Sequence, residues 1–205
     1  MKSAYDALSA SIEAKGVSVP AGTKLTGMPA LVDQIQTGGG GGEDYGYLTF
    51  TAEEATTLTL KQNGSIEPHK LLKSTDGVTW TKWENPSTNG ISLNAGESVY
   101  VKADKDALWR TATGNYVFNY FSSTKNIDCT GDVRSIVKLI VPAEYSYWIL
   151  RLFNDCTSLT TAPELPATTM TGKCYERMFN SCTSLTKAPE LPATTLAYDC
   201  YMSMF

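Results

Sequence analysis

Few side chains in this sequence are spaced as a catalytic site would need them. The single histidine, His69, lies in a Glu-Pro-His-Lys segment with no nucleophile near it, which favours an exposed loop residue over a general base. Two acidic pairs, Glu53 with Glu54 and Asp104 with Asp106, are of the kind a glycosidase uses, but both lie in hydrophilic turns. Nothing in the sequence places either pair across a cleft. We therefore predict that the protein is not an enzyme.

The acidic residues, glycines and cysteines also lack the spacing of metal or cofactor sites. Asp104 and Asp106 are not followed by the further oxygen ligands and glycine of a calcium loop. No Gly-Lys-Ser/Thr follows the glycine run at 38–42, as a phosphate-binding loop requires. The cysteines do not form the Cys-x-x-Cys pairs of a zinc site; they are Cys129, Cys156, Cys174, Cys182 and Cys200. Buried thiols explain them better than zinc or a disulfide framework, so we predict no cofactor and no metal.

Three tryptophans have the best chemistry for contacting a ligand. Trp80, Trp83 and Trp109 could stack on sugar rings, so a glycan-binding face is one interpretation. Trp80 and Trp83 are an odd number of residues apart, and in a regular strand such residues point to opposite faces. At least one of them is then a core residue. Core or interface packing is the favoured interpretation, with glycan binding as the alternative.

Composition limits the classes of partner. The 205 residues suffice for one large or two small domains, and a net charge of −4 gives no basic surface for nucleic acid or anionic membranes. No apolar run reaches the roughly 18 residues that span a bilayer. The first residues lack the apolar core of a secretory signal. We therefore expect a protein that stays in the cytoplasm where it is made, or that leaves as part of something larger.

The strongest pattern is an internal repeat. Residues 153–178 and 179–204 match at 18 of 26 positions without a gap, and Phe205 opens another copy. A period of this length is typical of stacked architectures in which each unit buries its face against the next. The shared apolar positions predict columns of side chains: Phe153/Phe179/Phe205, Leu159/Leu185, Leu165/Leu191, Met170/Leu196 and Met178/Met204. A degenerate earlier copy predicts that residues 135–141 form the strand of a capping repeat.

The repeat unit, Cys-Thr-Ser-Leu-Thr-x-Ala-Pro-Glu-Leu-Pro-Ala-Thr-Thr followed by Cys-Tyr, resembles BspA-like leucine-rich repeats of surface and phage proteins. The resemblance covers residues 129–205. It implies short strands at 159–165 and 185–191 in a parallel sheet, and a role in recognition. Such a stack would leave an apolar edge at residues 201–205. We expect either further repeats or a partner to cover that edge, and we favour further repeats.

Between residues 46 and 128 the pattern changes to the alternation of strands. Strand-like runs occur at 47–50, 57–60, 99–101 and 116–121. Asp76-Gly77 and Asn94–Glu97 are turn sequences between further apolar runs. Short strands with frequent turns predict a small antiparallel, immunoglobulin-like β-sandwich. The segment 73–83 with 91–100 also resembles the β-modules that precede BspA-like repeats.

The first 37 residues predict a helical segment too small to fold alone. Apolar stripes at 3–14 and from residue 28 are separated by an extended connection, and residues 38–45 form a glycine-rich linker. The run from Tyr5 to Gly38 resembles an N-terminal module of bacteriophage virion proteins. The resemblance implies anchoring or oligomerisation, for which the candidate residues are Tyr5, Leu8, Ile12, Val19, Pro20, Leu25, Pro29, Leu31, Val32 and Ile35. An ordinary helical hairpin packed on the β-domain is the alternative.

Together these patterns predict a mainly β, modular chain with four parts: a helical virion anchor at 1–37, a linker at 38–45, a β-sandwich at 46–128 and a leucine-rich-repeat solenoid at 129–205. The predicted function is a bacteriophage head or tail fibre, assembled in the host cytoplasm and located in the virion. Its expected partners are capsid, collar or tail proteins, further copies of itself in a homo-oligomer such as a trimer, and a host-surface glycan or protein. The alternatives are a bacterial cell-surface adhesin and a capsid decoration protein without a receptor.

Overall fold

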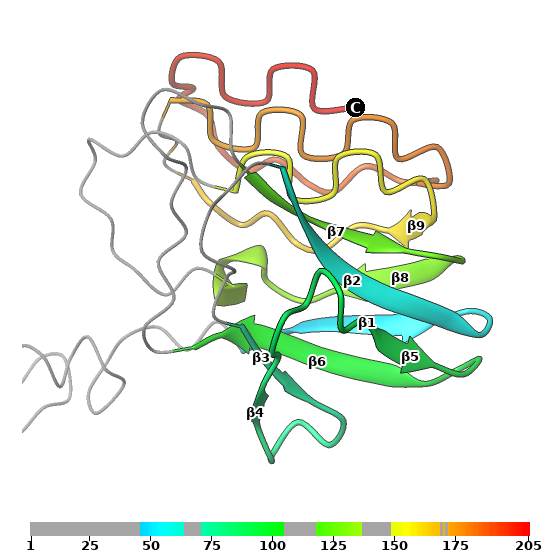
Figure 1. The fold of residues 1–205 in the computed structure, drawn as a ribbon. Helices are drawn as coiled ribbons and strands as arrows, with labels where there is room; N and C mark the ends of the chain where they lie inside the picture. Colours follow the sequence, from blue (N-terminus) through cyan, green and yellow to red (C-terminus); the bar gives the residue numbers. More distant parts are fainter. Residues whose placement is uncertain (1–45, 64–70, 105–117, 137–148, 169, 171) are drawn as a thin grey trace, which may run out of the picture. The chain divides into compact units, whose positions relative to one another are not determined.

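The computed structural model describes residues 46–63, 71–104, 118–136, 149–168, 170 and 172–205, which belong to one structural unit. This part is mainly β, with strands in two sheets and, within it, a single short 3-10 helix (Figure 1). None of its helices is long and apolar enough to cross a membrane. The predicted anchor at 1–37 and linker at 38–45 lie outside the described residues.

The larger sheet has the strand order β4-β3-β6-β1-β8-β9. Its strands are β1 (Leu48–Ala52), β3 (Leu71–Ser74), β4 (Thr81–Lys82), β6 (Ser98–Ala103), β8 (Ile127–Thr130) and β9 (Leu159–Thr161). All neighbours are antiparallel except β8 and β9, which are parallel. In β6 every second residue is buried, because alternate side chains of a strand point to opposite faces of the sheet.

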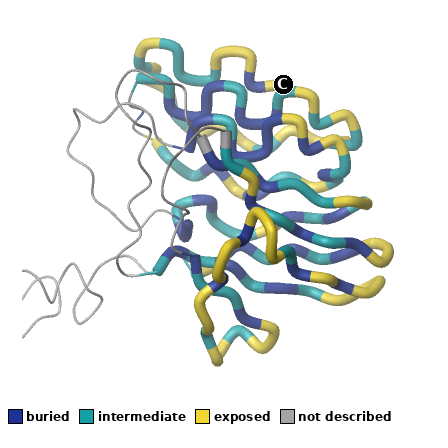
Figure 2. The backbone as a smooth tube through the Cα atoms, in the orientation of Figure 1, coloured by how far each residue is buried: buried dark blue, intermediate teal, exposed yellow. Residues whose placement is uncertain are grey.

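The smaller sheet has the order β5-β2-β7 and packs its apolar face on that of the larger sheet. Its strands are β2 (Thr56–Asn63), β5 (Ile91–Leu93) and β7 (Phe118–Ser123). The rings of Phe50 in β1 and Phe121 in β7 lie 4.7 Å apart between centroids, which joins the two faces. Figure 2 shows the buried residues along the strands and the exposed ones mainly at the turns that join them. The predicted two-layer alternation is thus present.

Both turn sequences behave differently from simple two-residue hairpins. Asp76-Gly77 lies in the hairpin loop between β3 and β4, which spans residues 75–80 and is longer than a two-residue turn. Asp76 accepts hydrogen bonds from the Val78 and Thr79 N–H groups, and these bonds keep the loop residues out of the strand pairing. Asn94–Glu97 joins β5 to β6, which lie in different sheets. That turn therefore crosses from one layer to the other.

The structure differs from the strands predicted in the repeat region wherever it describes them, except at the start of the 159–165 segment. Residues 135 and 136 belong to the 3-10 helix Val133–Ile136 instead of a strand, and residues 137–141 lie outside the described part. In the first repeat only β9 forms, covering the start of the predicted 159–165 strand. In the second repeat the segment 185–191 is not a strand. Pro189 lacks an N–H group to donate to a ladder, which is consistent with this irregular backbone.

The repeats stack as three rows of chain, which we define as the first row (149–155), the second row (173–181) and the third row (199–205). Each row alternates between negative and positive φ, with positive values at the equivalent residues Ile149, Tyr175 and Tyr201 and at Arg151, Arg177 and Ser203. Alternation of this kind turns successive N–H groups toward one side of the chain. Non-glycine residues with positive φ are strained, and the hydrogen bonds between rows offset that strain.

These hydrogen bonds run mostly in one direction along the stack. The N–H groups of Arg151, Phe153 and Asp155 donate to the Glu176, Met178 and Asn180 carbonyls at 2.9–3.0 Å. The second row donates in the same way to the third: Lys173 to Tyr198, Arg177 to Met202, and Phe179 to Met204. The aromatic rings of Phe153, Phe179 and Phe205 stack above one another at 5.6 and 5.9 Å. The rows therefore repeat in space with the sequence period (Figure 1, yellow to red).

The repeat rows and the two sheets share one core. β8 pairs with β9 in the first repeat, and the Phe121 N–H group in β7 donates to the Leu152 carbonyl at 2.7 Å. The buried cluster runs without a break from Leu48 to Met204. The predicted boundary between residues 128 and 129 falls inside β8.

Candidate functional site

Several predicted site residues lie outside the described part of the structure. They are the ten anchor residues from Tyr5 to Ile35, Trp109, His69 and Asp106. Glu53 and Glu54 are exposed in the turn between β1 and β2, and Glu54 lies 3.9 Å from the Lys125 ammonium group. That exposed turn is not a cleft.

Trp83 is a core residue. Its side chain is 2% exposed, and its indole Nε1–H donates to the Asn89 carbonyl at 2.8 Å. The Trp83 N–H group also donates to the Leu71 carbonyl at 2.9 Å, which fixes the chain after β4 against β3. An indole held in this way fastens the 84–89 loop and offers no ring face to a ligand.

Trp80 lies on the outer face of the larger sheet, in an aromatic cluster with Tyr47 and Tyr100. The Tyr47 ring centroid is 5.6 Å from that of Trp80 and 4.8 Å from that of Tyr100, with the rings tilted. The Lys102 ammonium group lies 3.9 Å from the centroid of the Trp80 ring, which is cation–π geometry. Lys102 therefore covers part of the indole, and the cluster holds the β3–β4 loop on the sheet.

The sequence prediction named Trp80 but missed its three neighbours. Tyr100 and Lys102 are two residues apart in β6, on the face opposite the buried Val99 and Val101. The alternation that identified the core side of this strand also places both residues on the outer side. The alternating pattern of the strand could thus have found Tyr100 and Lys102. Only the fold could show that the 75–80 loop brings Trp80 onto them.

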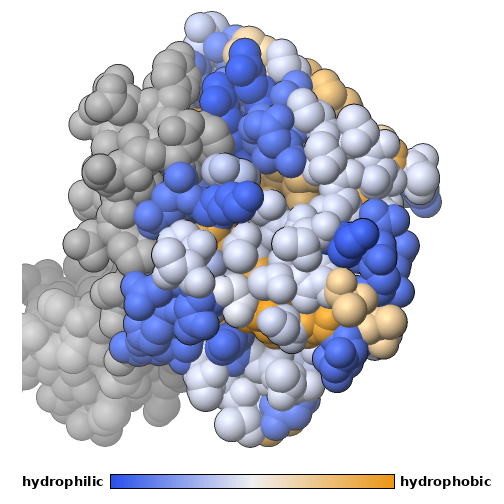
Figure 3. Space-filling model, turned by 45° about the vertical axis from the view of Figure 1, so that its right-hand side comes forward, coloured by the Kyte–Doolittle hydropathy of each residue, from blue (hydrophilic) through white to orange (hydrophobic). Residues whose placement is uncertain are grey.

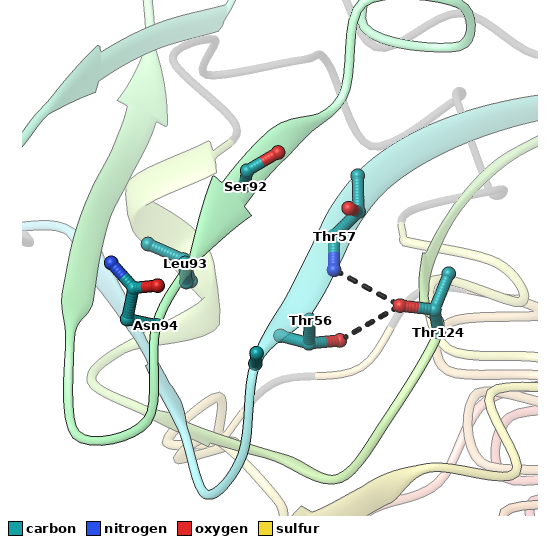
Figure 4. A pocket seen from close by; sticks show the side chains of 7 residues that line it. Thr56, Thr57, Ser92, Leu93, Asn94 and Thr124 are labelled. Atoms are coloured by element: carbon teal, nitrogen blue, oxygen red, sulfur yellow. Dashed lines mark hydrogen bonds between the residues drawn. The ribbon is translucent and has the colours of Figure 1, made fainter.

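A polar hollow of about 310 Å³ opens between β2, β5 and the β7–β8 turn (Figure 4). It is lined by Ala55, Thr56, Thr57, Ser92, Leu93, Asn94 and Thr124. The Thr124 hydroxyl accepts from the Thr57 N–H group at 3.0 Å, and Thr56 donates to the Lys125 carbonyl at 3.3 Å. The Thr56 and Thr124 hydroxyls already bond to one another and to the backbone, so they are less available to a small polar ligand. None of its lining residues is an acid, a base or a thiol.

Glu176 is a buried carboxylate surrounded by cations. Its side chain is 2% exposed, and its oxygens lie 3.8 Å from Arg151, 3.9 Å from Lys173 and 4.0 Å from Arg177. Its Oε2 atom accepts no hydrogen bond from any described residue. The sequence prediction missed this residue. The equivalent positions one repeat away are apolar, Leu150 and Met202, so a polar exception in an apolar column is the signal that could have found it. The four charges join the first two rows.

Cys129, Cys156 and Cys174 are buried, and Cys182 and Cys200 are half-buried. Burial raises the pKa of the Cys129 and Cys156 thiols and raises that of Cys182 to about 12. The Cys182 thiol donates to the Phe153 carbonyl at 3.1 Å, a bond between consecutive repeats. All five cysteines are free thiols. Within the described ranges no group of three or more histidine, cysteine or acidic side chains is placed to hold a metal ion.

The visible surface offers small separate apolar areas. Figure 3 shows a face that is mostly neutral or hydrophilic, with short orange patches between them. The large apolar side chains that are exposed are Tyr47, Val78, Leu191, Leu196, Tyr198, Met202 and Phe205. Five of these seven lie between residues 191 and 205, so the exposed large apolar side chains concentrate in that segment.

Comparison of the chain with family models, with curated proteins and with solved structures found no match.

Proposed function

We propose that the protein is a structural component of a bacteriophage virion, a head or tail fibre that displays its repeats for recognition of a host surface. In this proposal the two-sheet part is an immunoglobulin-like spacer, the repeats form a BspA-like leucine-rich solenoid, and residues 1–37 form a helical anchor. The repeat pattern and the resemblance of residues 5–38 to a virion module motivate it.

The observation that carries the proposal is the shared core of the sheets and the repeat rows. Phe121 contacts Phe153, and β8 pairs with β9, so the rows are joined to the sheets by direct contacts between described residues. Binding by a rigid surface loses less conformational entropy than binding by a mobile one. A spacer fused to a rigid stack is suited to presenting a surface at a fixed distance from an anchor.

The first test asks whether the chain is part of a particle. Purified virions from a strain that carries the gene should contain the protein by mass spectrometry, and electron microscopy with a labelled antibody should locate it on the head or the tail. Leu8→Asp with Ile12→Asp places charges on the predicted anchor stripe and should abolish incorporation. Val78→Asp changes a residue that is 81% exposed on the β3–β4 loop and should leave incorporation intact.

The same antibody separates the alternatives. If the antibody labels intact bacteria that carry no phage genes, the protein is a cell-surface adhesin and the fibre proposal is wrong. A decoration protein would be favoured if the protein is found in virions but virions that lack the gene still adsorb normally to host cells.

A further inference from the structure

Two lysines flank a leucine on the outer face of the larger sheet. Leu72 in β3 is the register partner of Lys82 in β4 and of Lys102 in β6. Neighbouring strands lie about 4.8 Å apart, so the Cα atoms of the two lysines are about 10 Å apart across the sheet. Val101 and Ala103 on either side of Lys102 are buried, so the Lys102 side chain points away from the core.

Among the residues that the structure describes, no carboxylate forms an ion pair with Lys82 or Lys102. The loop that passes over this face, residues 75–80, contains a single acid, Asp76, and its carboxylate already accepts two backbone N–H groups of the loop. The Lys102 ammonium group lies over the Trp80 ring instead, at 3.9 Å from its centroid. Two cations on one face without a paired carboxylate favour an anionic ligand.

Three aromatic rings lie beside the lysines. We define the outer aromatic face by five residues: Tyr47, Trp80, Tyr100, Lys82 and Lys102. Tyr47 is the central ring, at 4.8 Å from Tyr100 and 5.6 Å from Trp80 between centroids, and it is 36% exposed. The 75–80 loop packs on the same rings, because a Cβ added at Gly77 would lie 3.3 Å from the Tyr47 hydroxyl oxygen. The rings are therefore held in place before a ligand arrives, which lowers the entropy cost of binding.

The neighbouring strands supply hydroxyl groups. Thr49 in β1 is the register partner of Tyr100 in β6 and of Thr130 in β8, which places all three side chains on one face. β6 and β1 are each paired on both sides, so their backbone groups are already bonded and offer no free edge to a peptide strand. A pyranose ring presents C–H groups on its flat side and hydroxyls at its rim. Those C–H groups pack on the negative face of an aromatic ring, and the hydroxyls bond to polar side chains.

We propose that the outer aromatic face binds a saccharide that carries a carboxylate. One sugar ring packs on Tyr47, the carboxylate lies between Lys102 and Lys82, and ring hydroxyls bond to the threonine hydroxyls. Trp80 contacts both Tyr47 and Lys102, so the two ends of this site are within the length of a disaccharide. The site belongs to the larger sheet. It is independent of the repeats, to which the proposed function assigns recognition, and of whether the chain is part of a virion.

The test titrates the full chain with two acidic saccharides, sialyllactose and trigalacturonate, and with their neutral counterparts, lactose and methyl-esterified trigalacturonate. NMR follows the indole N–H signals, and Trp80→Phe identifies the signal of Trp80. At least one acidic saccharide should shift the Trp80 signal and bind at least tenfold more tightly than its neutral counterpart. The Trp83 signal is an internal control and should not shift, because that N–H group is buried and donates to the Asn89 carbonyl.

Two variants locate the site. Lys102→Met keeps an unbranched side chain over Trp80 but removes the charge, and Tyr47→Ser removes the central ring; each should weaken binding at least tenfold. Lys125→Met removes a lysine charge from the exposed β7–β8 turn, at the other end of β1, and should bind like the unmodified chain. Near-ultraviolet circular dichroism checks that the variants are folded, and the Trp80 signal of the unmodified chain tests the proposal without any variant.

Three results would overturn the proposal. One is an unmoved Trp80 signal with both acidic saccharides at millimolar concentration. Another is binding that Lys102→Met and Tyr47→Ser leave unchanged, because the saccharide would then lie elsewhere. The third is binding of hexaglutamate that is as tight as that of the saccharides and equally sensitive to Lys102→Met, because that would make the face a site for acidic peptides.

Discussion

The ring of Phe121 in β7 lies 5.6 Å from the ring of Phe153 in the first row, at an angle of 31°. Phe121 also contacts Phe50, and Phe153 stacks on Phe179. The aromatic contacts therefore run from one sheet of the β part into the second repeat. Both parts depend on the same buried rings, which predicts that they unfold together.

Phe153→Ala should destabilise the whole described part by about 3–5 kcal/mol, because it removes a fully buried ring and leaves a cavity. Thermal unfolding should remain a single transition, moved to lower temperature, when followed by tryptophan fluorescence and by circular dichroism. Phe205→Ala is the matched control at the exposed end of the same column and should cost about 1 kcal/mol or less. Loss of the repeats alone, with the sheets melting at the original temperature, would contradict the shared core.

Gly131→Ala should cost more stability than Gly96→Ala. Both glycines have positive φ, +94° and +79°, so alanine is strained at each by about 1–2 kcal/mol. An added Cβ at Gly131 would also collide with the Tyr47 carbonyl, whereas nothing lies within 4 Å of one at Gly96. Urea unfolding of the two variants measures the difference. Equal losses would mean that the backbone at Gly131 shifts freely.

Asp76→Asn should lower the melting temperature at neutral pH and have less effect in acid. The Thr79 and Val78 N–H groups and the Ser74 hydroxyl donate to the Asp76 carboxylate and hold its pKa well below the usual range. A depressed folded pKa contributes stability above the unfolded value of about 3.9, and that contribution is lost as pH falls toward the folded value. The gap in melting temperature between the chain and the variant should therefore shrink from pH 5 to pH 2.

Glu97→Gln provides a parallel case, because the Asn94 N–H group lowers the pKa of Glu97 in the same direction. The difference in melting temperature between the unmodified chain and Glu97→Gln should also become smaller in acid. A gap that stays constant from pH 7 to pH 2 in both variants would rule out charge-assisted capping in these turns.

The Cys182 thiol should react with a thiol reagent at pH 8 about a thousandfold more slowly in the folded protein than in urea. Burial raises its pKa to about 12, compared with about 8.5 in an unfolded chain, so the reactive thiolate is scarce. Because the unfolded thiol ionises first, stability should fall as pH rises above about 8.5, and Cys182→Ala should reduce that fall. Rapid labelling of Cys182, located by mass spectrometry, would show that the second repeat opens readily.

Glu176→Gln should destabilise the protein by about 1–3 kcal/mol, because Arg151, Lys173 and Arg177 lose a shared buried anion. The loss should be smaller in high salt, which screens the repulsion among the cations. Glu190→Gln changes an exposed carboxylate in the second repeat and should stay within about 0.5 kcal/mol. Equal unfolding free energies for the two variants would remove the ion cluster from the forces that join the rows.

Much of the architecture follows from local patterns in the sequence. Alternating residues such as Leu48, Phe50 and Ala52 in β1 identified a strand and its buried side, because side-chain direction reverses at each residue. The 26-residue period identified columns such as Phe153, Phe179 and Phe205 before any contact was known, because identical units bury identical positions when they stack.

The sites depended on relations that no local pattern contains. The turn at Asn94–Glu97 looks like a hairpin, yet only packing of the two sheets decides that β5 and β6 separate. Trp80 meets Lys102 because a loop folds back over the sheet, and Glu176 meets Arg151 because rows 26 residues apart stack. The sequence by itself determined which residues are apolar and with what period. The tertiary structure alone decided which strands pair and which charges meet, because those outcomes depend on contacts between segments distant in the chain.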